Sequence, residues 1–165
     1  MDIRLARIDD RLIHGQVATV WSKECLVDRI LVISDEVAKD PLRKFMLREA
    51  APPGVFAHVL PVERFLAVNE QQLFENEKVM LLFTGPAEAA RLVHGGLKLK
   101  SINIGGMSFS VGKKMITNFI SVDEKDISAF SYLAKQGIEL EIRKVPTDRK
   151  VSLMTLLKKE KSVTT

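Results

Sequence analysis

The stretch Ala6-Arg7-Ile8-Asp9-Asp10-Arg11-Leu12-Ile13-His14-Gly15-Gln16 passes from a strand pattern, through a charged loop, into a helix pattern. Alternating apolar residues at Ile3, Leu5 and Ile8 give its first part the character of a β-strand. His14 follows a loop rich in Asp and Arg and stands directly before the helix pattern. In open α/β sheets, ligands bind at this kind of strand-to-helix junction.

The rest of the chain repeats this alternation between short β-branched runs and longer amphipathic runs. The expected strands cover residues 3–8, 29–34, 55–60, 79–83, 101–104, 117–121 and 139–143. The expected helices cover residues 15–25, 41–51, 62–74, 87–95, 123–136 and 151–159. Such alternation predicts an α/β fold with an open, mostly parallel sheet and helices on both faces.

One segment interrupts the rhythm. Residues 107–114 read as a hairpin-type excursion ahead of the strand at 117–121, so we expect an antiparallel edge to the sheet. The sequence contains no internal repeat, no low-complexity linker and no sign of a second-domain boundary. A single domain over residues 1–165 is therefore expected.

Composition excludes several classes of protein. The net charge of +4 is mild, and one Trp and one Tyr are too few for the stacking platforms of a nucleic-acid binder. The sequence has no run of about 18 apolar residues, so no membrane-spanning helix is predicted. The strand pattern near Met1 lacks the apolar stretch of a signal peptide. A lone cysteine, Cys25, excludes an internal disulfide and fits a reducing cytosol, so we expect a cytoplasmic protein.

The loops that follow parallel strands open at one edge of a sheet, and there they define a candidate pocket. His14 is the central residue, because a neutral imidazole is a good nucleophile near pH 7. The helix start beyond it offers free N–H groups and partial positive charge, which suit a phosphate. We therefore expect a histidine that handles a phosphoryl group. The pocket is expected to contain His14, Arg7, Asp9, Asp10, Arg11, Thr84, Gly85, Gly105 and Gly106.

The charged neighbours of His14 are expected to divide the work. One of Asp9 and Asp10 can hold the ring through its second N–H, and the other can orient an arginine or cap the loop. Asp9 is favoured for the ring, and the choice stays open. Arg11, within the loop, is the expected phosphate clamp. Arg7 is a second phosphate ligand, although its place in the strand allows it to be part-buried and paired.

Further phosphate contacts are expected from small residues. Gly15 allows close approach of backbone and ligand, and Thr84, Gly85, Gly105 and Gly106 can supply N–H groups and a hydroxyl. Neither glycine-rich nucleotide fingerprint occurs. His58 and His94 have no partners at metal-ligand spacing, so no metal or other cofactor is expected.

The block from Ile8 to Val17, Ile-Asp-Asp-Arg-Leu-Ile-His-Gly-Gln-Val, resembles a known family. The chain is similar, over nearly its whole length, to the enzyme IIB subunit of the mannose/fructose/sorbose family of the bacterial phosphoenolpyruvate-dependent sugar phosphotransferase system (PTS). The other matching stretches are Asp40-Pro-Leu-Arg43, Leu82-Phe-Thr-Gly-Pro86, Asn103-Ile-Gly-Gly-Met107, and Ser121-Val-Asp with Asp126-Ile-Ser-Ala-Phe130.

This resemblance implies a protein-Nπ-phosphohistidine–sugar phosphotransferase that needs no metal. His14 would accept phosphate on Nδ1 from a phosphohistidine of the IIA protein or domain. It would then pass the group to a sugar carried by the membrane subunits IIC and IID, which implies peripheral association with that transporter. The resemblance leaves open which sugar is used and whether the chain forms a homo-oligomer.

Two other functions compete on the residues alone. A hydrolase could use His14 as a general base, and it would need a deep pocket with a separate nucleophile or metal. A regulatory module could sense phosphate through the same loop without catalysis.

Overall fold

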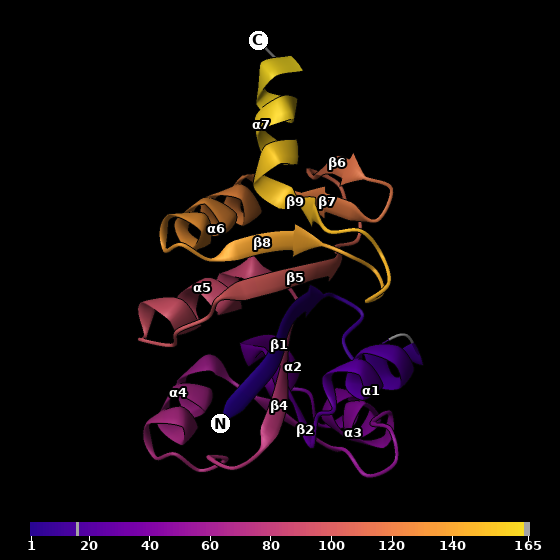
Figure 1. Ribbon diagram of the computed structural model, residues 1–165, viewed down its shortest axis with the longest axis vertical. Helices are drawn as coiled ribbons and strands as arrows, with labels where there is room; N and C mark the ends of the chain where they lie inside the picture. Colours follow the sequence, from indigo (N-terminus) through magenta and orange to yellow (C-terminus); the bar gives the residue numbers. More distant parts are fainter. Residues whose placement is uncertain (16, 164–165) are drawn as a thin grey trace.

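The computed structural model describes residues 1–15 and 17–163 and is built around a seven-stranded sheet (Figure 1). The strands lie in the order β3-β2-β4-β1-β5-β8-β9, and every neighbouring pair from β3 to β8 is parallel. Their bounds are β1 Asp2–Asp9, β2 Arg29–Ile33, β3 Phe56–Leu60, β4 Lys78–Phe83, β5 Ser101–Gly106, β8 Glu139–Ile142 and β9 Val151–Ser152. The predicted mostly parallel α/β sheet is confirmed.

Helices cover both faces of this sheet, and Figure 1 shows α4, α5 and α6 on one side and α1 and α3 on the other. The helical elements are η1 Val17–Trp21, α1 Ser22–Cys25, α2 Asp35–Ala38, α3 Pro41–Glu49, α4 Val62–Glu70, α5 Pro86–His94, α6 Glu124–Lys135 and α7 Leu153–Val163. Within residues 1–15 and 17–163, no helix has the length and apolar character to cross a membrane.

Strand β2 shows why the sheet needs helices on both faces. The side chains from Ile30 to Ile33 are fully buried and alternate between two cores, because successive residues of a strand point to opposite faces. Leu31 and Ile33 belong to the core beneath α4, α5 and α6, whereas Ile30 and Val32 belong to the core beneath η1 and α3. A continuous apolar run of this kind is typical of a parallel strand.

The antiparallel part of the molecule is where the sequence patterns were least accurate. Residues 114–122 form a separate two-stranded antiparallel sheet, β6 Lys114–Thr117 and β7 Ile120–Val122, instead of one strand at 117–121. The antiparallel edge of the main sheet exists, but it comes from β9, which pairs with β8. β9 has only two residues, too few to show the alternation of a strand. The sequence pattern therefore assigns them to the helix that follows.

The helix predicted at residues 15–25 is present but begins in a wider form. Residues Val17–Trp21 make a π-helix, and the hydroxyl of Ser22 donates to the carbonyl of Val17 at 2.9 Å. Gln16 lies outside the described residues. Single π-turns of this kind are frequent at functional sites, and this one places Trp21 in the buried core beside β1.

The candidate site lies at the carboxyl ends of the neighbouring strands β1 and β5. These strands are neighbours, yet the chain leaves β1 toward η1 on one face and leaves β5 toward β6, β7 and α6 on the other. Loops that diverge from adjacent parallel strands in this way open a crevice for a ligand. The loop of His14 lies at this point.

Candidate functional site

The loop after β1 is held in a strained, fixed shape. Leu12 has a φ of +59°, a left-handed conformation that costs a residue with a side chain about 1 kcal/mol. Its amide donates to the carbonyl of Asp9 at 2.9 Å, and its side chain is fully buried among the residues beneath η1. The buried leucine anchors the tight turn, and the turn brings His14 back over the end of β1.

His14 contacts Asp9, and this contact decides which aspartate holds the ring. Its Nε2 lies 3.0 Å from Oδ2 of Asp9. An ionised carboxylate can only accept, so Nε2 carries a hydrogen, and in the neutral form of the ring Nδ1 carries the lone pair. In the described part of the chain, Nδ1 has no hydrogen-bond partner. The side chain is 20% exposed, which leaves it accessible to an approaching group.

Asp9 is completely buried but well supplied with donors. Its carboxylate accepts from Nη2 of Arg7 at 3.0 Å and from the backbone N–H of Arg11 at 3.1 Å, in addition to His14. Burial raises the pKa of Asp9, but the bond from His14, the charge of Arg7 and the Arg11 amide outweigh it. The pKa of Asp9 therefore lies below its usual value, and the carboxylate is ionised at neutral pH.

Arg7 lies behind Asp9, within the protein. Its side chain is 1% exposed, and it donates to the side chain of Asn103 and to the carbonyls of Arg143 and Lys144 at 3.1 and 3.2 Å. The guanidinium also lies 5.0 Å from the ring centroid of Trp21. The expected direct phosphate contact is not supported for Arg7, because both of its Nη groups donate to protein acceptors within the buried interior.

Gly105 and Gly106 also differ from expectation. They are the last two residues of β5 and are buried, instead of forming an open loop. A Cβ built at Gly105 would lie 1.9 Å from Nη2 of Arg7, and one at Gly106 would lie 3.3 Å from Oδ1 of Asp9. Both glycines make room for the Arg7–Asp9 pair. The sequence pattern predicts a different role for them, as backbone donors to phosphate.

Asp10 binds the segment that follows β5. It accepts from the backbone N–H of Ser108 at 2.6 Å and from its hydroxyl at 3.1 Å. Asp10 thereby ties the loop of His14 to the segment that leaves β5. The neighbouring aspartates thus have separate partners, one in the site and one in the adjacent loop.

The remaining candidates lie at the exposed rim. Arg11 is 59% exposed, and its Nε lies 3.5 Å from Oδ1 of Asp9. Gly15 is exposed beyond His14, and no atom lies within 4 Å of the Cβ that it lacks. Thr84 and Gly85 follow β4, the strand beside β1, but the hydroxyl of Thr84 is 3.3 Å from Oε1 of Glu88. Arg11 is the cation that the structure places on the surface beside His14.

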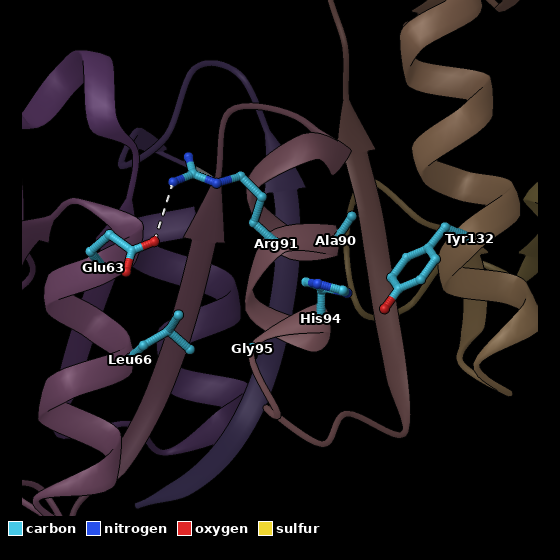
Figure 2. Close-up of a pocket in the computed structure, with 7 residues that line it drawn as sticks. All are labelled: Glu63, Leu66, Ala90, Arg91, His94, Gly95 and Tyr132. Atoms are coloured by element: carbon cyan, nitrogen blue, oxygen red, sulfur yellow. Dashed lines mark ion pairs between the residues drawn. The ribbon is translucent and has the colours of Figure 1, made fainter.

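Two pockets among the described residues do not include His14 in their lining. One of about 430 Å³ lies between α4, α5 and α6, with Leu66, His94 and Tyr132 among its lining, and contains none of residues 9–15 (Figure 2). Another of about 310 Å³ adjoins Asp10 and Arg11 beside β5. Within the described ranges, no three His, Cys, Asp or Glu residues cluster as a metal site would require.

A buried ionised aspartate that fixes the tautomer of a partly exposed histidine is compatible with several chemistries, and comparison with known proteins settles the family. Residues 3–165 match the family described as the PTS system sorbose subfamily IIB component. The chain belongs to this IIB family.

Known proteins of the family are similar to this IIB component over most of its length. It is 57% identical over 159 residues to the mannose-specific EIIAB component of Escherichia coli K12, covering 96% of this chain but only 49% of that protein. The sorbose-specific EIIB component of Lacticaseibacillus casei is 50% identical over 148 residues, covering 90% of each chain. This chain thus spans about half the length of the EIIAB relatives.

Solved structures agree with the fold of the IIB component. The IIBSor domain of the sorbose permease from Klebsiella pneumoniae superposes with a TM-score of 0.93 at 43% identity, covering 96% of this chain and 98% of that one. The crystal structure of manxB from Thermoanaerobacter tengcongensis gives a TM-score of 0.87 at 36% identity, with 96% of each chain covered.

Several residues of the site in this IIB component escaped the sequence patterns. Asn103 is buried and links Arg7 to Glu141, to which its Nδ2 donates at 3.2 Å. Trp21 donates from Nε1 to the Lys144 carbonyl at 2.9 Å. The available signals were a polar residue inside the apolar run of β5 and a lone tryptophan seven residues after His14.

Proposed function

We propose that this IIB component is a phosphoryl carrier that accepts phosphate on Nδ1 of His14 from a phosphohistidine of the IIA protein or domain. The observation that carries the proposal is the 3.0 Å contact between Nε2 of His14 and Asp9. It assigns the hydrogen to Nε2 and leaves the lone pair of Nδ1 directed away from the buried carboxylate.

The transfer balances without a proton being moved on this chain. The lone pair of Nδ1 forms the new N–P bond while the N–P bond of the donor breaks and its imidazole leaves with the electron pair. Nε2 keeps its hydrogen, so the ring of His14 gains positive charge next to the ionised Asp9. The same charged ring is a good leaving group in the next transfer, because it departs as neutral imidazole.

Arg11 is the proposed clamp for the phosphoryl oxygens, since its guanidinium is exposed beside Asp9. The N–H of Gly15 and those at Thr84 and Gly85 are proposed as further donors at the rim. Arg7 acts as a positioning residue: it holds Asp9, which holds His14. Phosphoryl transfer depends on this kind of positioning and electrostatic stabilisation.

The acceptor is proposed to be a sugar of the mannose, fructose or sorbose class, presented by the membrane subunits IIC and IID. The names of the mannose- and sorbose-specific relatives support this substrate class. The protein would act in the cytoplasm at the inner surface of the transporter, with the exposed His14 loop facing its partners.

Labelling with phosphorylated IIA tests the proposal. Wild-type protein should take up an acid-labile, base-stable label, and nitrogen chemical shifts should place it on Nδ1. His58→Ala should be labelled normally, since His58 lies on β3, the far edge strand. His14→Ala should remain unlabelled. Absence of label on the wild type, or label on His14→Ala, would refute the carrier function.

A further inference from the structure

Three apolar side chains stand exposed on the segment that joins β5 to β6. Phe109 is 62% exposed, Val111 is 100% exposed and Met115 is 55% exposed. Scattered single apolar residues are normal on protein surfaces, but a group beside a functional loop marks an interaction site. We call Phe109, Val111 and Met115 the exposed apolar cluster.

The backbone that carries this cluster is held in place. The amide of Lys113 donates to the Ser110 carbonyl at 3.0 Å, which closes a four-residue turn. Gly112, its third residue, has a φ of +92°, as a type II turn requires. Val111 is therefore presented at the tip of a preformed turn, and little conformational entropy would be lost on binding.

The cluster is also fixed relative to His14. Asp10 binds Ser108 through two hydrogen bonds of 2.6 and 3.1 Å, and the next residue along the chain is Phe109. Asp10 adjoins Asp9, the residue that orients His14. A surface that touches the cluster is consequently held in register with the proposed phosphoryl acceptor.

Two cations lie in the same hollow as Phe109 and Met115 of the cluster. The pocket of about 310 Å³ is lined by Arg11 and Lys144 together with Phe109 and Met115. Lys144 is exposed, with its Nζ 4.5 Å from the ring centroid of Phe119, and Arg11 is exposed beside Asp9. This face therefore combines apolar contacts with positive charge.

We propose that the exposed apolar cluster is the docking surface for the protein that donates the phosphoryl group. This inference rests on the proposed function and extends it to the partner's surface. The donor carries an anionic phosphohistidine, which complements Arg11 and Lys144, and it must present an apolar recess for Phe109 and Val111 with acidic groups at its rim.

Charge explains why the complex forms and separates. Before transfer the cations face the anionic phosphoryl group on the donor. After transfer that negative charge belongs to His14 and offsets Arg11 on this chain, so the attraction to the donor falls. A symmetric dimer through the same face would instead bring the cations of two copies together.

The test measures the rate of His14 phosphorylation against the concentration of phosphorylated IIA, using Val111→Asp and Phe109→Ser in the full chain. Both side chains are exposed, so thermal unfolding should match the wild type. We expect KM for phosphorylated IIA to rise at least about tenfold, with kcat within about twofold. Leu73→Ser is the matched control, because Leu73 is 49% exposed in the loop from α4 to the start of β4, whereas His14 follows the carboxyl end of β1; the kinetics of this variant should not change.

Three results would overturn the docking surface. Unchanged KM in both variants is the first. The second is normal labelling by IIA with impaired delivery to sugar in membrane vesicles, which would assign the cluster to the membrane subunits. The third is a dimer that Val111→Asp converts to monomers. Failure of the carrier function itself looks different, since wild-type His14 would then stay unlabelled at every IIA concentration.

Discussion

Two arginine–carboxylate pairs lie at opposite ends of the sheet's parallel strands and are built from similar parts. Arg7 and Asp9 lie at the carboxyl end of β1, where Arg7 contacts the ring of Trp21. Arg29 pairs with Glu77 at the start of β2 and β4, and its guanidinium lies 4.4 Å from the centroid of Phe74. Each pair joins a charge pair to an aromatic ring.

The pairs differ in what the carboxylate is left to do. Arg29 binds both oxygens of Glu77 through two nitrogens, and the pair is partly open to solvent. Arg7 donates a single hydrogen bond to Asp9, and its Nη groups also donate to Asn103 of β5 and to two carbonyls in the loop after β8. Asp9 keeps accepting capacity for His14. A pair that closes on itself stabilises an edge of the fold, and one that stays open can orient a reactive group.

The largest expected difference between the two pairs is the loss of stability when the arginine is removed. Arg7→Met leaves a buried, ionised Asp9 without its cation, and should lower the free energy of unfolding by about 3 to 5 kcal/mol. Arg29→Met should lower it by about 1 kcal/mol or less, because solvent screens Glu77. Urea denaturation of both variants measures the difference. Equal losses in the free energy of unfolding would mean that the buried Asp9 depends on its arginine no more than Glu77 does.

Neutralising the carboxylate should affect transfer in only one pair. Asp9→Asn removes the charge opposite the imidazolium ring and frees the tautomer of His14, so phosphorylation should slow by about 10² to 10³-fold. Glu77→Gln should leave the rate within about twofold. Rapid-quench measurement with phosphorylated IIA checks both, and a normal rate in Asp9→Asn would remove Asp9 from the mechanism.

Substitution of Arg11 tests whether this exposed cation is needed for phosphoryl transfer but not for the stability of the fold. Its side chain is 59% exposed, so Arg11→Ala should change the free energy of unfolding by less than about 0.5 kcal/mol. Transfer should nevertheless slow about tenfold or more, through loss of charge at the phosphoryl oxygens. Unchanged transfer kinetics would refute the clamp role.

Acid titration should give the smallest contrast. The pKa of Asp9 and that of Glu77 are both lowered in the folded protein. Their stabilisation is present above the unfolded pKa values, about 4, and is lost as pH falls through the lower folded values. Unfolding free energies between pH 2 and 6 should lose part of their acid dependence in Asp9→Asn and less of it in Glu77→Gln. An unaltered profile in Asp9→Asn would contradict the lowered pKa.

The parallel sheet could be predicted because its signals are local. Apolar runs such as that of β2 and the Asp40-Pro41 helix start each specify their own element, and Asp40 indeed caps α3 by accepting from the amide of Arg43. β9 could not be predicted in this way, since a two-residue strand exists only through its pairing with β8.

The partners of Asp9 and Asp10 illustrate the same limit within the site. Asp9 is the last residue of β1 and lies on the same strand face as Arg7, two residues earlier, so their pairing follows the strand period. The contact of Asp10 with Ser108 spans 98 positions and depends on where the segment after β5 returns. Local pattern therefore indicates the former but not the latter.

The place of Trp21 has a practical consequence for spectroscopy. It is the only tryptophan in the chain, it is 2% exposed, and two guanidinium groups, those of Arg7 and Arg143, lie 5.0 and 5.2 Å from its ring centroid. Indole emission responds to nearby charge, and this ring senses the cation that holds Asp9. We therefore expect the proposed phosphorylation of His14 to change the emission of Trp21, so that intrinsic fluorescence could follow it in real time without an attached dye.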